Sequence, residues 1–79
     1  LVEAPAIKEL QDLCTAVDLD NATDFNDYPE YQTLVQNIFK WRIYSHKVQY
    51  EFDDPWGKIL ADFKVLKSEN IKQALAFDY

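Results

Sequence analysis

The sequence predicts an all-α fold, a small bundle of three to four helices that forms a single helical domain over residues 1–79. Two observations carry this prediction. The chain contains one Gly and three Pro residues, too few for the tight turns of a many-stranded sheet. Apolar residues make up 48% of the chain, and along most of it they recur at steps of three and four, which is the spacing of one face of a helix.

The first helix is expected over residues 5–17. Pro5 suits the first helical position, where its missing N–H is not needed. One apolar stripe then follows the helical period, formed by Ile7, Leu10, Leu13, Cys14 and Val17. Residues 18–28 are rich in Asp, Asn and Thr, which bond to their own backbone in turns, so we expect a loop there.

The second helix is expected to begin near Tyr28, with Pro29 in its first turn. Its apolar residues cover more than half of its circumference, and Phe39 and Ile43 widen the apolar arc. Such a helix is typically covered on two sides, so we expect it at the centre of the bundle. Residues 46–52 alternate as in a strand. A lone strand has nothing to pair with, which favours a continued helix or an extended linker.

The third helix is expected to begin at Asp54-Pro55, an N-cap acid followed by proline. Its apolar residues extend at helical spacing from Trp56 to Leu66. Ser68 is expected to cap a last helix. Since neither Gly nor Pro lies at the junction of these two helices, we expect them to meet at a shallow kink.

The charge of the chain excludes several classes of partner. The net charge is −6. The first 39 residues carry eight acidic side chains and one basic side chain. The other 40 residues carry six acidic and seven basic side chains. Nucleic-acid binding needs a basic face, and anionic lipid attracts basic segments, so we expect neither nucleic acid nor membrane as a partner. The apolar runs are too short for a membrane-spanning helix.

The sequence offers little for catalysis, so we expect no enzyme. His46 is the only histidine, and a general base needs a partner and a pocket, whereas its neighbours are Ser45 and Lys47. Cys14 is the only cysteine and lies on an apolar stripe, which indicates a buried, inert thiol. Gly57 alone cannot form a glycine-rich phosphate loop.

The same residues give no reason to expect a metal or cofactor. One Cys and one His exclude a zinc finger and an internal disulfide framework. The acids between Asp18 and Asp27 resemble a calcium loop, but the EF-hand pattern fails because Thr23 stands where Gly is needed and Pro29 where Glu is needed. Asn21-Ala22-Thr23 is a formal glycosylation sequon, which matters only for a chain that matures in a secretory pathway.

Two segments are the candidates for binding a partner protein. The first is the acidic loop, with Asp20, Asp24 and Asp27, because acidic side chains steer a basic partner and raise the association rate. The second is the aromatic segment, where Tyr50, Phe52 and Trp56 lie at an irregular joint and are expected to be exposed. Aromatic side chains dominate the binding energy of interfaces.

Residues 17–24 followed by Tyr28-Pro-Glu-Tyr-Gln-Thr-Leu34 resemble the start of the WY-type helical domain of secreted oomycete RXLR effectors. Residues 60–63 and 68–75 are similar to the closing helix pair of that family. The resemblance covers about sixty residues. It implies a virulence protein that is secreted, acts inside the host plant cell, binds a host protein, and has neither enzymatic activity nor a cofactor. One Cys without a disulfide suits a reducing cytosol.

Three functional hypotheses remain at this point. The first is a non-enzymatic, effector-like interaction module. The second is a small acidic inhibitor or immunity-type protein, located in the cytoplasm, that blocks a basic enzyme. The third is an enzyme that uses His46. A homodimer that pairs through an aromatic patch is compatible with the first two.

Overall fold

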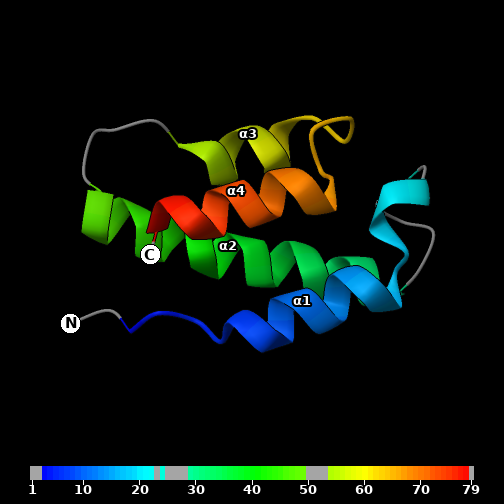
Figure 1. Ribbon diagram of the computed structural model, residues 1–79, viewed down its shortest axis with the longest axis horizontal. Coiled ribbons are helices and arrows are strands. Elements are labelled where there is room, and N and C mark those ends of the chain that lie inside the picture. The colour runs from blue at the N-terminus through cyan, green and yellow to red at the C-terminus, as the bar shows by residue number, and fades with distance from the viewer. Residues whose placement is uncertain (1–2, 23, 25–28, 50–53, 79) are drawn as a thin grey trace.

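The computed structural model describes residues 3–22, 24, 29–49 and 54–78. These residues form α1 (Ile7–Ala16), the 3-10 turn η1 (Leu19–Asn21), α2 (Pro29–Gln49), α3 (Pro55–Ala61) and α4 (Ser68–Asp78). Consecutive helices run in alternating directions, so both ends of the described chain lie at the same end of the bundle (Figure 1). The described residues contain no strand, and the predicted all-α bundle is confirmed.

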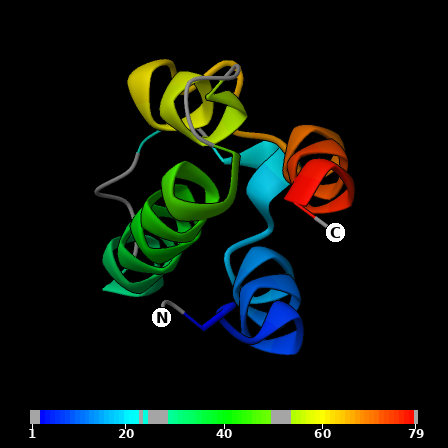
Figure 2. The same cartoon turned by 90° about the vertical axis from the view of Figure 1, so that its left-hand side faces the viewer.

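The long helix α2 is the common packing partner of the other three helices. It contacts α1, α3 and α4, and the view along the bundle shows these three arranged beside it (Figure 2). This confirms the central place that its apolar residues predict. Residues 46–49, the described part of the segment with alternating residues, are helical and belong to α2.

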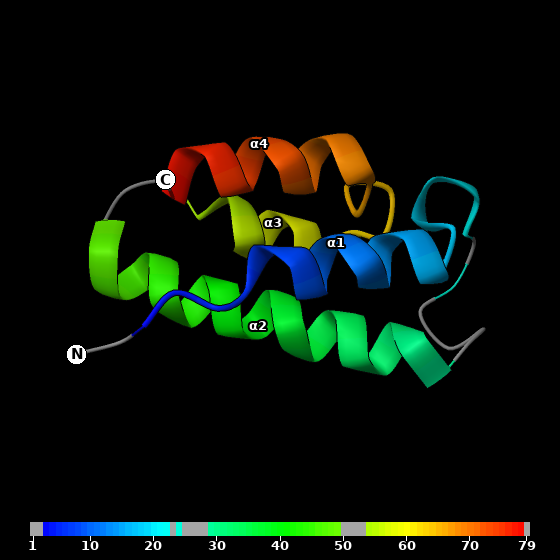
Figure 3. The same cartoon turned by 60° about the horizontal axis from the view of Figure 1, so that its bottom comes forward.

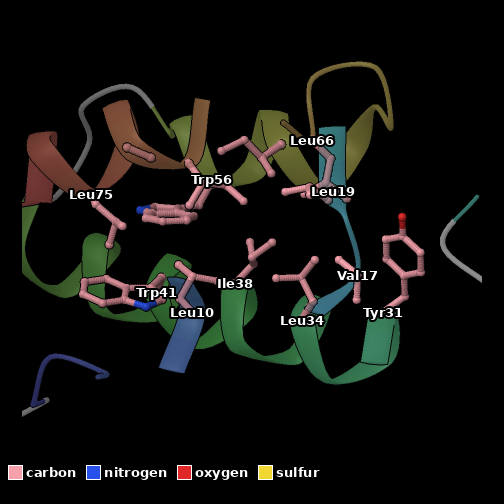
Figure 4. Close-up of a cluster of buried hydrophobic side chains, with 13 residues drawn as sticks. Leu10, Val17, Leu19, Tyr31, Leu34, Ile38, Trp41, Trp56, Leu66 and Leu75 are labelled. Carbon is pink, nitrogen blue, oxygen red and sulfur yellow. The ribbon is translucent and has the colours of Figure 1, made fainter. Parts of the chain in front are cut away.

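The core is built around two tryptophan side chains from different helices (Figure 4). Trp41 of α2 and Trp56 of α3 are both fully buried, and their rings stack with centroids 5.8 Å apart and an interplanar angle of 21°. Tyr44 meets Trp41 edge-on, with centroids 5.8 Å apart. Large stacked rings fill much of the volume of a small core, and this pair fixes α3 against α2.

The start of the chain differs from the prediction. Pro5 lies in an extended segment, and α1 begins two residues later, after Ala6, which makes no side-chain capping hydrogen bond. The predicted stripe is otherwise correct, since Leu10 and Val17 are buried. The expected loop after α1 contains η1, and its Leu19 is 1% exposed, so this polar segment also contributes a core residue.

The connection from α3 to α4 is a reversal of the chain, so the predicted shallow kink is wrong. The helix ends at Ala61, and the carboxylate of Asp62 accepts a hydrogen bond from the backbone N–H of Lys64. An Asp side chain that bonds locally competes with helical hydrogen bonds. Leu66 is nevertheless fully buried, which explains why its spacing suggests a longer helix. The predicted start of α3 is confirmed, because Asp54 accepts from the backbone N–H of Gly57 at 2.9 Å.

Candidate functional site

The acidic loop has a structural role that the sequence alone does not show. Asp20 Oδ1 accepts a hydrogen bond from the backbone N–H of Ser68 at 3.0 Å. The backbone oxygen of Asp20 accepts a second one from Lys67 Nζ at 3.4 Å. The carboxylate thus satisfies one of the unpaired N–H groups at the start of α4. Asp24 is exposed, and Asp27 lies outside the described residues.

The expected exposure of Trp56 in the aromatic segment is wrong. This side chain has no exposed surface, because it stacks on Trp41 in the core. Sequence spacing cannot distinguish a buried Trp56 from an exposed one, since Trp56 lies in the first turn of α3. Tyr50 and Phe52 lie outside the described residues. Within the described part of the chain, the aromatic segment therefore supplies a core residue where we expected an interface residue.

Exposed apolar surface occurs instead on α2. Phe39 is 47% exposed and Ile43 is 52% exposed, and residues four apart on a helix are neighbours on one face. We call these two side chains the α2 apolar patch. The sequence predicts that Phe39 and Ile43 widen the apolar arc of this helix. It does not predict that they are exposed, because periodicity does not show where the neighbouring helices end.

A charged side chain adjoins this patch and is held in place. The guanidinium carbon of Arg42 lies 5.9 Å from the ring centroid of Phe39. Arg42 Nε donates to Asp54 Oδ2 at 2.7 Å, and this ion pair is 39% exposed at Arg42 and 24% at Asp54. Arg42 is therefore oriented by α3 and covers one edge of the patch. Apolar side chains therefore lie beside a cationic group whose position is set by Asp54.

A groove lies next to the patch, between the segment that precedes α1 and the middle of α2. Its volume is about 350 Å³. It is lined by Glu3, Ala4, Pro5, Ala6 and Glu9 on one side and by Asn37, Lys40 and Ile43 on the other. Figure 3 shows the extended segment lying along α2. We call this feature the N-terminal groove. Ile43 belongs both to the groove and to the α2 apolar patch, so the two are continuous.

The groove contains a polar group that the sequence analysis does not single out. The side chain of Asn37 is 2% exposed, and its Oδ1 accepts no hydrogen bond. An unsatisfied buried acceptor is uncommon in folded proteins. The available signal is positional, because Asn37 lies three residues after Leu34 and four before Trp41, within the stripe that faces the core.

The thiol of Cys14 lies on the predicted apolar face of α1 but is less buried than expected. It is partly buried and lines a separate hollow between α1 and α4. Burial, together with the negative charge of Asp20, raises the pKa of the Cys14 thiol to about 11. A thiol with so high a pKa contains little thiolate at neutral pH, and the thiolate is the nucleophilic form.

Among the described residues, no group of three or more His, Cys, Asp or Glu side chains could hold a metal ion. The side chain of His46, on which the enzyme hypothesis depends, lies outside what the structure describes. In the same described ranges, no helix is long and apolar enough to cross a bilayer.

Comparison of the chain with protein-family models, with curated protein sequences and with solved structures gives no match.

Proposed function

We propose that this chain is a non-enzymatic protein-interaction module and that the α2 apolar patch is the centre of its interface. The observation that carries the proposal is the exposure of Phe39 and Ile43, which are the large apolar side chains left uncovered among the described residues. Apolar side chains that bury into a partner supply most of the affinity at an interface.

The surroundings of the patch support this function. The patch lies on the longest helix, which packs on the other three, so the backbone that carries it is already ordered when a partner docks. Preorganised surfaces bind more tightly because less conformational entropy is lost. The charge of −7 on the first 39 residues would attract a partner with a basic surface and accelerate its approach.

The resemblance to WY-type effector domains adds the biological setting to the proposal. On that basis the protein is secreted by a plant pathogen, and its partner is a host protein inside the plant cell. The acidic-inhibitor hypothesis differs in its prediction for the interface, since it places the binding energy on the exposed acids and not on the apolar patch. The two hypotheses can therefore be separated by mutagenesis.

The test compares two double variants with the unchanged chain in capture experiments from plant extract. Proteins captured by the unchanged chain are identified, purified and measured by calorimetry. Phe39→Ala with Ile43→Ala removes the patch, and Gln32→Ala with Lys72→Ala changes exposed residues elsewhere on α2 and α4. We expect the patch variant to bind at least about 30-fold more weakly, since central interface residues contribute about 2 kcal/mol or more. The control should bind normally.

Two other results would redirect the interpretation. If the patch variant binds normally while Asp24→Asn with Glu30→Gln abolishes binding, the inhibitor hypothesis is favoured and the patch proposal is wrong. Sedimentation velocity of the protein alone tests a homodimer. A dimer that Phe39→Ala dissociates would mean that a second copy of this chain covers the patch.

A further inference from the structure

The buried amide of Asn37 occupies a helix position that favours an apolar residue. It lies among core residues of α2, its side chain is 2% exposed, and its Oδ1 has no donor. An amide buried without its hydrogen bonds destabilises a fold, and Leu would fit the same helix position without that penalty. A buried unsatisfied group calls for a physical explanation, and a donor supplied by a ligand is one such explanation.

The walls of the N-terminal groove define the ligand chemistry. Glu3 and Glu9 place two carboxylates on one side, and Lys40 places one ammonium on the other, so the groove carries a net negative charge. Pro5 and Ile43 provide apolar surface. The volume of about 350 Å³ lies at the lower end for ligand sites, which suits one side chain better than a large cofactor.

We propose that the N-terminal groove receives an arginine side chain of the partner protein. The guanidinium donates a hydrogen bond to Asn37 Oδ1, Glu3 and Glu9 balance its charge, and its aliphatic stem lies against Ile43. Arginine fits better than lysine because its planar donors are less strongly hydrated. This inference rests on the proposed interaction function and names the chemistry of the partner next to the α2 apolar patch.

Binding requires a small rearrangement in the groove. Asn37 Oδ1 has less than 1 Å² of exposed surface, so the guanidinium reaches it after a half-turn of the terminal amide or after an outward shift of residues 3–6. These residues have no regular secondary structure, and an amide half-turn exchanges oxygen and nitrogen in almost the same volume. The side-chain NH₂ signal of Asn37 should therefore respond directly to the ligand.

The experiment is an NMR titration of the full 79-residue chain with the capped peptide acetyl-Gly-Ala-Arg-Ala-Gly-amide. Two matched peptides carry citrulline or norleucine in place of arginine. Citrulline keeps donors but loses the charge, and norleucine loses both. We expect saturable shifts at the Asn37 side chain, Ala6 and Lys40 with arginine, several-fold weaker binding with citrulline, and no localised shifts with norleucine.

Two variants complete the test. Asn37→Leu should raise the midpoint of thermal unfolding and abolish the arginine-dependent shifts at Ala6 and Lys40. Gln36→Leu, at the adjacent exposed position, should leave those shifts unchanged. The inference is overturned if arginine and norleucine peptides act alike, if no shifts occur, or if Asn37→Leu binds arginine as well as the unchanged chain. The wild-type titration is decisive even if a variant fails to fold.

The titration uses the unchanged chain, whereas the capture experiment alters Ile43, which lines both the groove and the patch, so the two results are read separately. Loss of partner binding in the Phe39 and Ile43 variant with no arginine-dependent shifts would retain the interaction function and reject the groove. Specific arginine shifts with normal partner binding by that variant would retain the groove and reject the patch.

Discussion

Arg42 of α2 and Asp54, the N-cap residue of α3, form a hydrogen-bonded ion pair in which Arg42 Nε lies 2.7 Å from Asp54 Oδ2. The other carboxylate oxygen of Asp54 accepts from the backbone N–H of Gly57 at 2.9 Å. One carboxylate therefore starts a helix and joins it to its neighbour. The same pair holds Arg42 beside Phe39, so helix capping in α3 helps to shape the α2 apolar patch.

Gly57→Ala is expected to destabilise the protein, although alanine favours helices. A Cβ at this position would lie 2.9 Å from Asp54 Cγ and closer still to Oδ2, which forces the capping carboxylate away. Alanine gains about 1 kcal/mol in helix propensity, whereas the displaced cap and the disturbed ion pair cost more, for a net loss of about 1 kcal/mol. Urea unfolding measures the change.

The matched control for this prediction is Lys58→Ala, which changes an exposed residue in the same helix. It should leave the free energy of unfolding within about 0.5 kcal/mol of the unchanged chain. If Gly57→Ala is more stable than the unchanged chain, helix propensity outweighs the contact with Asp54 and the capping argument fails.

Asp20→Ala is expected to weaken the start of α4. The carboxylate accepts from the N–H of Ser68, and loss of such a cap lowers the free energy of unfolding by about 1 kcal/mol. Asp20→Asn keeps an acceptor oxygen at the same place and should retain most of that stability. Both variants are compared by urea unfolding. Equal losses in the two would mean that the negative charge matters and the hydrogen bond does not.

Trp56→Ala is expected to lower the free energy of unfolding by about 3–5 kcal/mol, the usual effect of removing a buried aromatic side chain. The free energy of unfolding of a whole domain of this size is only about 4–12 kcal/mol, so the variant would be partly unfolded at moderate temperature. Trp56→Phe keeps a ring against Trp41 and should lose less. Thermal unfolding followed by near-ultraviolet circular dichroism measures both.

The control here is Phe39→Ala, which removes an aromatic ring that is 47% exposed. It should change the free energy of unfolding far less than Trp56→Ala. Similar losses from the two variants would contradict the assignment of Phe39 to the surface and Trp56 to the core. Because Trp56→Ala perturbs folding, loss of partner binding in that variant says nothing about an interface.

Cys14 is expected to react slowly with alkylating reagents at pH 8. Its pKa of about 11 lies above the ordinary value of 9.0, so the folded protein contains roughly a hundredth of the thiolate of an ordinary cysteine. Iodoacetamide labelling followed by mass spectrometry, with glutathione as the reference thiol, measures the rate. A rate equal to that of glutathione would show that the thiol is exposed.

The same shift makes stability depend on pH. Because the folded-state pKa is raised, the unfolded chain loses the Cys14 proton first as the pH rises. The stabilising contribution is therefore complete below about pH 9 and is lost between pH 9 and about 11. Cys14→Ser removes this titration, so its free energy of unfolding should fall less over that range. Identical curves for the two proteins would contradict the burial of the thiol.

Part of the fold could be predicted from local sequence, because the cap of α3 and the apolar stripe of α1 are set by residues that are neighbours in the chain. Asp54-Pro55 fixes the beginning of α3, and the apolar stripe of α1 predicts its buried face. The reversal after Ala61 could not be predicted in this way, because Leu66 is buried in helical register although it belongs to a turn. Periodicity indicates which residues are buried. It does not distinguish a helix from a turn that buries a residue at the same spacing.

The candidate site could be predicted least well. The sequence by itself determined that the chain is helical, acidic and rich in aromatic residues. Only the tertiary structure decided that Trp56 lies in the core and that Phe39 and Ile43 lie outside it. Likewise it decided that Asp20 caps α4 from 48 residues away. The physical reason is that an apolar side chain is buried only where another helix reaches it, and the lengths and directions of the neighbouring helices are set by the packing of the whole bundle.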